Sequence, residues 1–269
     1  GIPISEYGFS LSRNADEYLL DVDYFYSEGQ RFDGQIIFDG ENLKFIDAKF
    51  SQLQLKYMSQ FIPSLKGLDI SGTSTGRVSY RYDPRVPNLD MVIDIENLSF
   101  IQGQLGNVFI EMVNHGKGYD IINFRSRGLH HLNLTGHLES MNAFELSPMA
   151  GSMIRLDAFD YFSKQKLFGH VKLAGTFKGS SSGFEYDGSI ESDDFEFDGH
   201  RFDYLFSDLS ASSSTVDFRR LLVEHNGGKM DIYGNIQRLS MPRDEFDYAL
   251  NLDLHFSNFD IKLFSNISK

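Results

Sequence analysis

Residues 246–256 read Phe-Asp-Tyr-Ala-Leu-Asn-Leu-Asp-Leu-His-Phe, with a large apolar side chain at every second position. Small or polar residues fill the positions between them. Successive side chains of a β-strand point to opposite faces of its sheet, so this stretch would place six apolar groups on one face. Strict alternation predicts a sheet with one apolar face and one wet face.

The same alternation recurs along the chain and defines the side chains that we expect on the apolar face. It appears again in residues 18–26, 89–95, 132–134, 195–197 and 230–232. We take the apolar side to be the inward, concave one. The residues expected to line a groove on that side are Leu89, Met91, Ile93, Ile95, Leu132, Leu134, Phe195, Phe197, Met230, Ile232, Phe246, Tyr248, Leu250, Leu252 and Leu254.

Turn signals are frequent and helical signals are scarce. Asn226-Gly227 is a strong signal for a two-residue hairpin, because both residues tolerate positive φ. Two segments, residues 55–62 and residues 157–166, could each form a short helix after a strand. Pro63 would end the first of them.

A long repeat accompanies the alternation. Residues 50–59 read Phe-Ser-Gln-Leu-Gln-Leu-Lys-Tyr-Met-Ser, and a similar segment returns at residues 256–265, while a third copy begins at Met153. The block Gly-Thr-x-x-Gly occurs at residues 72–76 and again at residues 175–179. Ordered landmarks of this kind indicate an architecture that grows by stacking. We therefore expect residues 1–269 to be one continuous β-repeat fragment of a longer array, with recurring blocks near 50–76, 153–179 and 256–269.

Composition narrows the classes of partner and site. The net charge of −13 is spread along the chain, which argues against nucleic acid, whose phosphates need basic stripes. The chain has no cysteine, so disulfides, thiolate metal sites and cysteine nucleophiles are excluded.

Motifs for catalysis and for cofactor binding are missing from the sequence. It contains no phosphate-binding Walker loop and no Gly-x-Ser-x-Gly elbow. His130 and His131 are adjacent, so in a strand they would point to opposite faces and could not share a metal from one face. The acidic cluster of residues 193–198 is interpreted as the solvated face of a strand pair. We expect no enzyme activity, no cofactor and no metal.

The order of the motifs in residues 50–105 resembles the TamB family of translocation and assembly module proteins, within the AsmA-like, bridge-like lipid transfer group. A short segment at residues 53–62 precedes a Gly-Thr-x-x-Gly block at residues 70–78, a Pro-containing turn at residues 83–87 and an alternating strand at residues 89–100. The second repeat follows the same order from Leu156 to Phe195, except that residues 180–184 replace the Pro-containing turn.

This resemblance implies an all-β fold, the β-taco, in which an elongated antiparallel sheet folds lengthwise into a trough with an apolar interior and short helices at repeat junctions. It implies a place in the periplasm of a Gram-negative bacterium, with the full-length protein anchored in the inner membrane and spanning toward the outer membrane. The implied function is a hydrophobic groove for phospholipid transport between the membranes, linked to outer-membrane biogenesis. The alternative is a scaffold or chaperone for outer-membrane protein assembly with a barrel partner of the TamA/BamA type.

Physical reasoning is compatible with such a groove without the resemblance. A one-faced apolar sheet must bury that face, and phospholipid acyl chains could cover it at roughly 0.8 kcal/mol per buried CH₂. Alternation alone is equally compatible with two inner faces that close on each other as a dry sandwich. A surface adhesin or β-helix stalk and a carbohydrate-active sandwich enzyme are further alternatives. The first two copies of the repeat begin 103 residues apart, at Phe50 and Met153, and this spacing fits several hairpins better than the roughly 20–30 residues of a β-helix coil.

Overall fold

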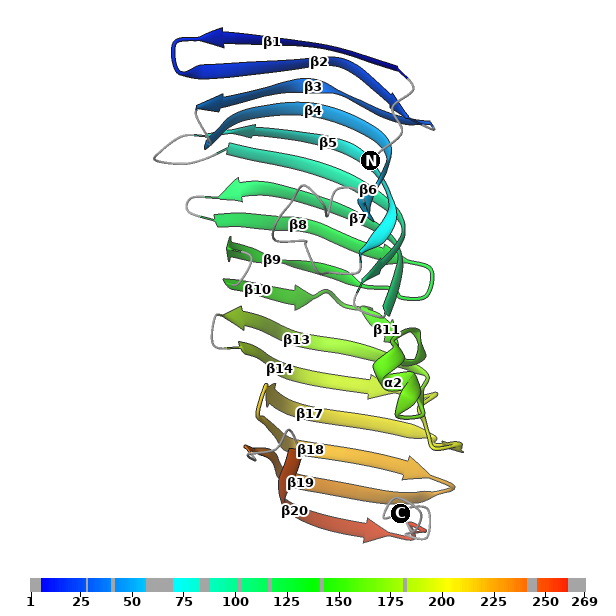
Figure 1. Cartoon of the computed structure of the whole chain (residues 1–269). Helices are drawn as coiled ribbons and strands as arrows, with labels where there is room; N and C mark the ends of the chain where they lie inside the picture. The colour runs from blue at the N-terminus through cyan, green and yellow to red at the C-terminus, as the bar shows by residue number, and fades with distance from the viewer. Residues whose placement is uncertain are drawn as a thin grey trace. The chain divides into compact units, whose positions relative to one another are not determined.

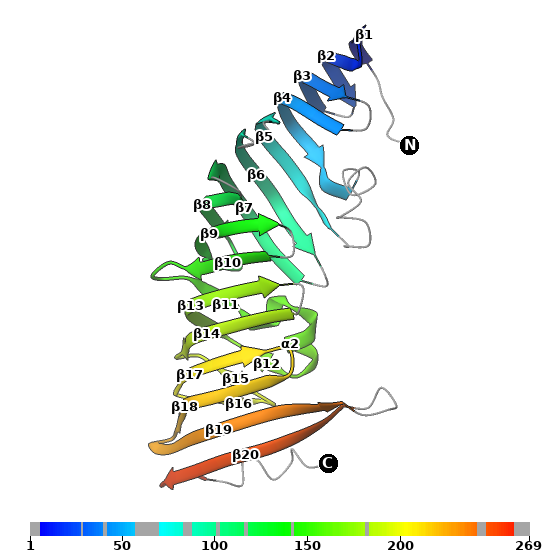
Figure 2. The same cartoon turned by 90° about the vertical axis from the view of Figure 1, so that its left-hand side faces the viewer.

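The computed structural model of the chain describes residues 6–27, 29–39, 42–56, 70–82, 88–100, 103–115, 118–140, 143–180, 183–240 and 246–260. The chain divides into two compact units, unit 1 (Gly1–Ser140) and unit 2 (Met141–Lys269). Both units consist almost entirely of antiparallel strands, which follow one another in chain order (Figures 1 and 2).

In unit 1, each strand of the described part pairs with the next strand in the chain, in an antiparallel meander from β1 to β9. No ladder joins β1 to β9 among the described residues, so the sheet of this unit is open. Its strands are β1 (Glu6–Asn14), β2 (Glu17–Ser27), β3 (Gln30–Asp39), β4 (Asn42–Gln54), β5 (Ser71–Arg81), β6 (Asn88–Phe100), β7 (Gly103–His115), β8 (Gly118–Arg127) and β9 (Asn133–Ser140).

In unit 2, the main sheet runs from β10 and β11 through β13, β14, β17, β18 and β19 to β20, and all its ladders are antiparallel. A small second sheet contains β12, β15 and β16. The elements are β10 (Ala143–Pro148), β11 (Met153–Arg155), η2 (Leu156–Ala158), α2 (Asp160–Lys164), β12 (Leu167–Phe168), β13 (His170–Ser180), β14 (Gly183–Ser192), β15 (Glu196–Phe197), β16 (His200–Arg201), β17 (Tyr204–Ser212), β18 (Thr215–His225), β19 (Gly228–Ser240) and β20 (Phe246–Ser257).

The prediction of an all-β, antiparallel and unclosed sheet is confirmed, and two local predictions are confirmed with it. Asn226 (φ 50°) and Gly227 (φ 76°) form the two-residue turn between β18 and β19, where His225 pairs with Gly228. The segment predicted as a helix at residues 157–166 contains η2 and α2. The helix predicted at residues 55–62 lies outside the described residues beyond Lys56.

Left-handed residues mark bulges near one end of β4 and β6. Gln52 and Asn97 both have φ of 54°, and each lies where its ladder shifts register. The N–H of Gln52 donates to Thr75 Oγ1 at 3.1 Å, and the N–H of Asn97 donates to Asn107 Oδ1 at 3.1 Å. Side chains of neighbouring strands thus satisfy the amides that the bulges displace. Because a bulge bends its strand, these strands curve toward that end (Figure 1).

The Gly-Thr-x-x-Gly blocks take equivalent places in the two units. Gly76 of β5 lies opposite Phe50 of β4, and Gly179 of β13 lies opposite Phe144 of β10. A Cβ added at Gly179 would come within 2.2 Å of the Phe144 ring. In the sequence repeat, by contrast, Phe50 aligns with Met153. Met153 lies in β11, after the turn that separates β10 from β11, and it pairs with Lys172 instead of Gly179.

Each unit has a buried apolar cluster at one end of its strands. The unit 1 cluster contains Ile95, Leu98 and Val108, with Leu55 and Ile70 packed against it from the segments that flank the β4–β5 connection. The unit 2 cluster is formed by Phe202, Val223, Met230 and Phe259, with Phe195, Phe197, Leu221 and Ile232 packed around it.

The close approach of β20 leaves no room for a side chain at Gly234 of β19. Its φ is +120°, and an added Cβ would lie 2.0 Å from the carbonyl oxygen of Asn251. We expect Gly234→Ala to lower the free energy of unfolding by about 3 kcal/mol, since the strained conformation and the backbone clash act together. The midpoint of urea unfolding, followed by circular dichroism, measures the loss.

Gly227→Ala is the matched control in the same hairpin. Gly227 also has positive φ (+76°), but an added Cβ would meet nothing within 4 Å. This substitution should cost about 1 kcal/mol from conformation alone. Equal losses in the two variants would contradict the assigned β19–β20 register.

Candidate functional site

An apolar face extends across unit 1, because the register aligns apolar positions of neighbouring strands. Leu89, Met91, Ile93 and Ile95 occupy alternate positions of β6. Asp90 and Asp94, which lie between them in the sequence, are exposed on the other face. The aligned rows are Tyr80–Leu89, Val78–Met91–Met112–Ile121, Gly76–Ile93–Ile110–Phe124–Leu134 and Ser74–Ile95–Val108–Ser126.

Leu132 and Leu134 belong to the same face. Leu134 of β9 pairs with Phe124 of β8 and ends one of the rows. Leu132 lies just before β9, where it is only 9% exposed and its carbonyl oxygen accepts a hydrogen bond from Ser126 N–H at 2.7 Å. Both leucines thus extend the apolar face toward the last strand of unit 1.

Most of this face remains partly open to solvent. Leu89, Met91 and Ile93 have intermediate exposure, whereas Ile95 and Val108 are buried in the cluster at the strand ends. No second sheet covers the face among the described strands of unit 1. Among its described strands, unit 1 is therefore a single layer and not a dry sandwich.

Unit 2 carries a matching face that is most exposed on β20. The aligned rows are Leu205–Val223–Met230–Phe256, Leu221–Ile232–Leu254, Leu209–Phe218–Gly234–Leu252 and Val216–Ile236–Leu250. Tyr248, Leu250 and Leu254 are 59%, 65% and 45% exposed. Phe246 belongs to β20, but its side chain lies outside the described part. Met230 is buried, and Ile232 packs beside it.

Phe195 and Phe197 lie over one end of this face instead of forming a row on it. Phe197 is in β15, and both rings pack against the cluster of Phe202 and Met230. The rings of Phe195 and Phe202 are 5.7 Å apart. These two phenylalanines, of which Phe197 belongs to the small sheet, therefore cover the apolar face at the strand ends.

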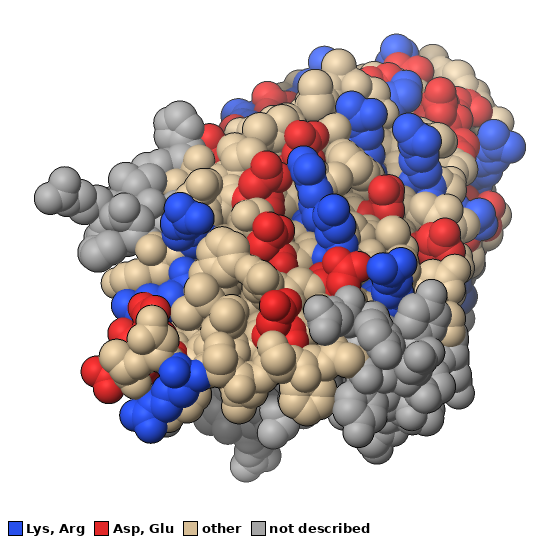
Figure 3. Space-filling model, turned by 90° about the horizontal axis from the view of Figure 1, so that it is seen from above, with Lys and Arg blue, Asp and Glu red and all other residues tan. Residues whose placement is uncertain are grey.

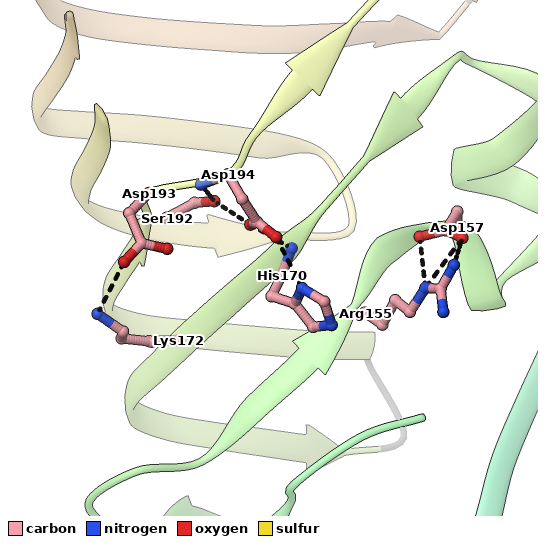
Figure 4. A network of polar contacts seen from close by, with 7 residues as sticks. All are labelled: Arg155, Asp157, His170, Lys172, Ser192, Asp193 and Asp194. Atoms are coloured by element: carbon pink, nitrogen blue, oxygen red, sulfur yellow. Dashed lines mark hydrogen bonds and ion pairs between the residues drawn. The ribbon is translucent and has the colours of Figure 1, made fainter. Parts of the chain in front are cut away.

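A set of polar contacts, here called the clasp, holds the segment before β15 to the start of β13 (Figure 4). Asp194 accepts hydrogen bonds from His170 N–H and from His170 Nδ1–H, each at 2.7 Å. Ser192 Oγ donates to the same carboxylate at 3.2 Å. Nearby, Arg155 holds Asp157 through three hydrogen bonds of 2.7–3.0 Å.

The clasp lowers the pKa of Asp194. Partial burial by itself raises that pKa, but the hydrogen bonds from His170 and Ser192 outweigh the burial. The hydrogen bonds from Arg155 likewise lower the pKa of Asp157. Both carboxylates thus stabilise the fold in their charged form.

Sequence reasoning missed several residues of the apolar face. Tyr186 of β14 is 6% exposed, and its hydroxyl lies 2.9 Å from Ala174 O and 2.8 Å from Ser189 O. Burial raises its pKa to about 12, so it remains a neutral donor. The alternation Val108–Ile110–Met112 was a usable signal, but Phe109 and Val113 on the opposite face obscured it.

The opposite face is polar and carries charges of both signs. Arg219 of β18 forms ion pairs with Asp187 at 3.0 Å and with Asp208 at 2.6 Å, across three strands of unit 2. Figure 3 shows acidic and basic side chains interspersed on the visible surface. Such a surface suits contact with water and does not form one extended patch of a single sign.

The described residues contain neither a cluster of metal-ligating side chains nor a membrane-spanning helix. No group of three or more His, Cys, Asp or Glu side chains is placed to hold a metal ion in that part of the chain. None of the helices described there has the length and apolar character to cross a membrane.

Comparison with known proteins returns no match: no family model, no curated protein and no solved structure is similar to this chain.

Removal of the Asp194 charge should weaken the clasp. We expect Asp194→Asn to lower the free energy of unfolding by about 1 kcal/mol at pH 7, because a charge-assisted acceptor of two His170 donors is lost. Amide exchange at His170 and in residues 196–201 should become faster, as measured by hydrogen–deuterium exchange. Asp193→Asn is the matched control. The Asp193 side chain is 72% exposed, and its carboxylate lies as far as 4.0 Å from Lys172 Nζ, so this ion pair is weak.

The same clasp predicts a pH dependence. A carboxyl whose pKa is lowered in the folded state stabilises the fold above its unfolded pKa, about 3.9, and this contribution disappears as the pH falls through the lower folded pKa. The difference in stability between the wild type and Asp194→Asn should therefore shrink as the pH falls below about 4. A difference that grows below that pH would contradict the assignment.

Proposed function

We propose that this chain binds phospholipid acyl chains along its apolar face and takes part in phospholipid transport between the inner and outer membranes of a Gram-negative bacterium. The observation that carries the proposal is the set of aligned apolar rows, whose side chains stay partly open to solvent in a single-layer sheet.

The energetics favour an apolar occupant. Exposed apolar surface costs roughly 25 cal/mol per Å², and an acyl chain recovers roughly 0.8 kcal/mol for each buried CH₂. An acyl chain that lies across the strands would meet an apolar side chain about every 4.8 Å, the spacing of neighbouring strands. Contact of this kind is repetitive and needs no single pocket.

The order of motifs along the sequence supports the biological setting. Under the resemblance to the TamB family, the full-length protein would be held in the inner membrane, reach through the periplasm and meet an outer-membrane barrel. A segment of such a protein needs a wet outer face and a continuous apolar inner face. Both features match the two faces of the units described above. We propose no catalytic role.

A second candidate function is a scaffold for outer-membrane protein assembly, and the edge strand β20 favours it. Within the described residues β20 pairs only with β19, and Tyr248, Leu250, Leu254 and Phe256 on it are well exposed. An apolar edge strand with free backbone groups is a template for an added strand.

Lipid binding tests the first function. Native mass spectrometry of the purified chain, with extraction of bound lipid, should detect phospholipid in more than trace amounts. We expect Leu252→Asp to reduce this binding at least tenfold, because it places a charge within a row on β20. Asn251→Asp is the matched control: it adds the same charge one residue away on the polar face, and it should bind lipid as the wild type does.

Circular dichroism establishes that each variant is folded. A folded Leu252→Asp variant with unchanged lipid content, or a wild-type chain that refuses added phospholipid, would contradict the lipid function.

Strand capture tests the second function. Peptides that copy single strands of outer-membrane barrels should bind the chain with micromolar affinity if β20 accepts an added strand, and added phospholipid should not compete. Fluorescence polarisation measures the binding. The absence of capture across a panel of such strands would remove the scaffold function.

A further inference from the structure

A hollow on the polar face of unit 1 has the composition of a binding site. Its volume is about 660 Å³, within the range of roughly 300–1,000 Å³ that small-molecule sites occupy. It lies over the middle strands of the unit, on the side opposite the apolar rows. The residues of β5 to β8 that line it are Thr75, Asp94, Ile95, Glu96, Asn107, Val108, Phe109, Asn123, Arg125 and Arg127, and all of them except Ile95 and Val108 belong to the polar face by their alternation.

The three central strands, β6 to β8, each contribute different functional groups to the hollow. β6 supplies two carboxylates, β7 supplies an amide and an aromatic ring, and β8 supplies an amide and two guanidinium groups. The register aligns Asp94 with Phe109, and Phe109 with Arg125. The backbones of the acidic strand β6 and the basic strand β8 are therefore two strand spacings apart, each of about 4.8 Å. An aromatic surface lies between the two charged sides.

These charges are not neutralised by one another. Within the described part of the chain, Asp94, Glu96 and Arg127 form no side-chain hydrogen bond or ion pair. The polar face of unit 2 differs, because Arg219 there joins the carboxylates of two strands. The carboxylates and guanidinium groups of the hollow thus remain available to a ligand.

The amides of the hollow are already oriented. Asn123 Oδ1 accepts a hydrogen bond from Arg125 Nε at 2.7 Å, which fixes that guanidinium group. Asn107 Oδ1 accepts from the N–H of the bulge residue Asn97 at 3.1 Å. With both oxygens used, the NH₂ groups of the two amides are left as donors.

We propose that this hollow binds a zwitterion, a small group that carries a primary ammonium and a phosphate or carboxylate joined by a short aliphatic spacer. Asp94 and Glu96 pair with the ammonium. Arg125 and Arg127 hold the anionic group through charge-assisted hydrogen bonds, which guanidinium groups form well with phosphate. Phe109 contacts the spacer and attracts the cation by its ring face. A simple anion would face the β6 carboxylates, and a simple cation would face the β8 guanidinium groups, so neither matches both sides.

This inference is independent of acyl-chain binding, because the hollow and the apolar rows lie on opposite faces of the sheet. The ligand chemistry has two sources, a free solute or an ethanolamine-type lipid headgroup at a membrane surface. The probes are therefore free phosphoethanolamine, vesicles of phosphatidylethanolamine mixed with phosphatidylcholine, and vesicles of phosphatidylcholine alone.

Isothermal titration calorimetry of the purified chain at low salt tests the site with two double variants. Asp94→Asn with Glu96→Gln removes the acidic side, and Arg125→Gln with Arg127→Gln removes the basic side. We expect each to weaken phosphoethanolamine binding at least tenfold. The first should keep any binding of inorganic phosphate, whereas the second should lose it. Asp90→Asn is the matched control, because Asp90 lies on the same face of β6 outside the hollow and should bind as the wild type does.

Each outcome decides the proposal. Binding of free phosphoethanolamine that depends on both sides supports it with a solute as ligand. Binding only to vesicles that contain phosphatidylethanolamine, again dependent on both sides, supports it with a headgroup as ligand. The absence of saturable binding to any probe overturns it. Binding that the double variants leave unchanged, in chains that circular dichroism shows to be folded, overturns it as well.

Discussion

The structure depends on one constraint: an alternating strand in a single-layer sheet has an apolar face, and no second layer covers the middle of that face among the described strands. Cross-strand register turns this local pattern into rows, so that Ile93 of β6 meets Ile110 of β7 and then Phe124 of β8. Each row gains its apolar character from side chains that are distant in sequence. In the described part, the fold satisfies this constraint internally at the strand ends, where Val108 and Val223 are buried in their clusters.

Bulges and folded-back segments decide where that internal burial occurs. Left-handed Gln52 and Asn97 bend β4 and β6 at the end where the unit 1 cluster forms. In unit 2 the small sheet performs this covering role, and the contacts between Asp194 and His170 keep it in place. The middle of each sheet is left partly open. A ligand that is long, apolar and indifferent to exact position suits such a surface better than a compact substrate does.

Much of this fold is predictable from the sequence, and the exceptions have physical causes. Strict alternation identified β6 and β20, since one face of each is wet, and the Asn226-Gly227 pair identified its hairpin. Alternation did not reveal that Phe195 and Phe197 contact the unit 2 cluster from a short segment, because period two does not show which sheet a strand joins. The pairing of Phe144 with Gly179 was hidden by a turn within the repeat. The charged hollow depends on register across β6 to β8, which no single segment encodes.

The central claim is that phospholipid acyl chains lie on the apolar face and not on the polar one. Photo-crosslinking with a phospholipid that carries a diazirine in its acyl chain, followed by peptide mass spectrometry, tests this directly. The account predicts crosslinks at inward residues such as Met91 and Ile93 and at Leu252, with their polar-face neighbours Asp90 and Asn251 unmodified. Crosslinks spread equally over both faces, or none above a lipid-free background, would contradict it.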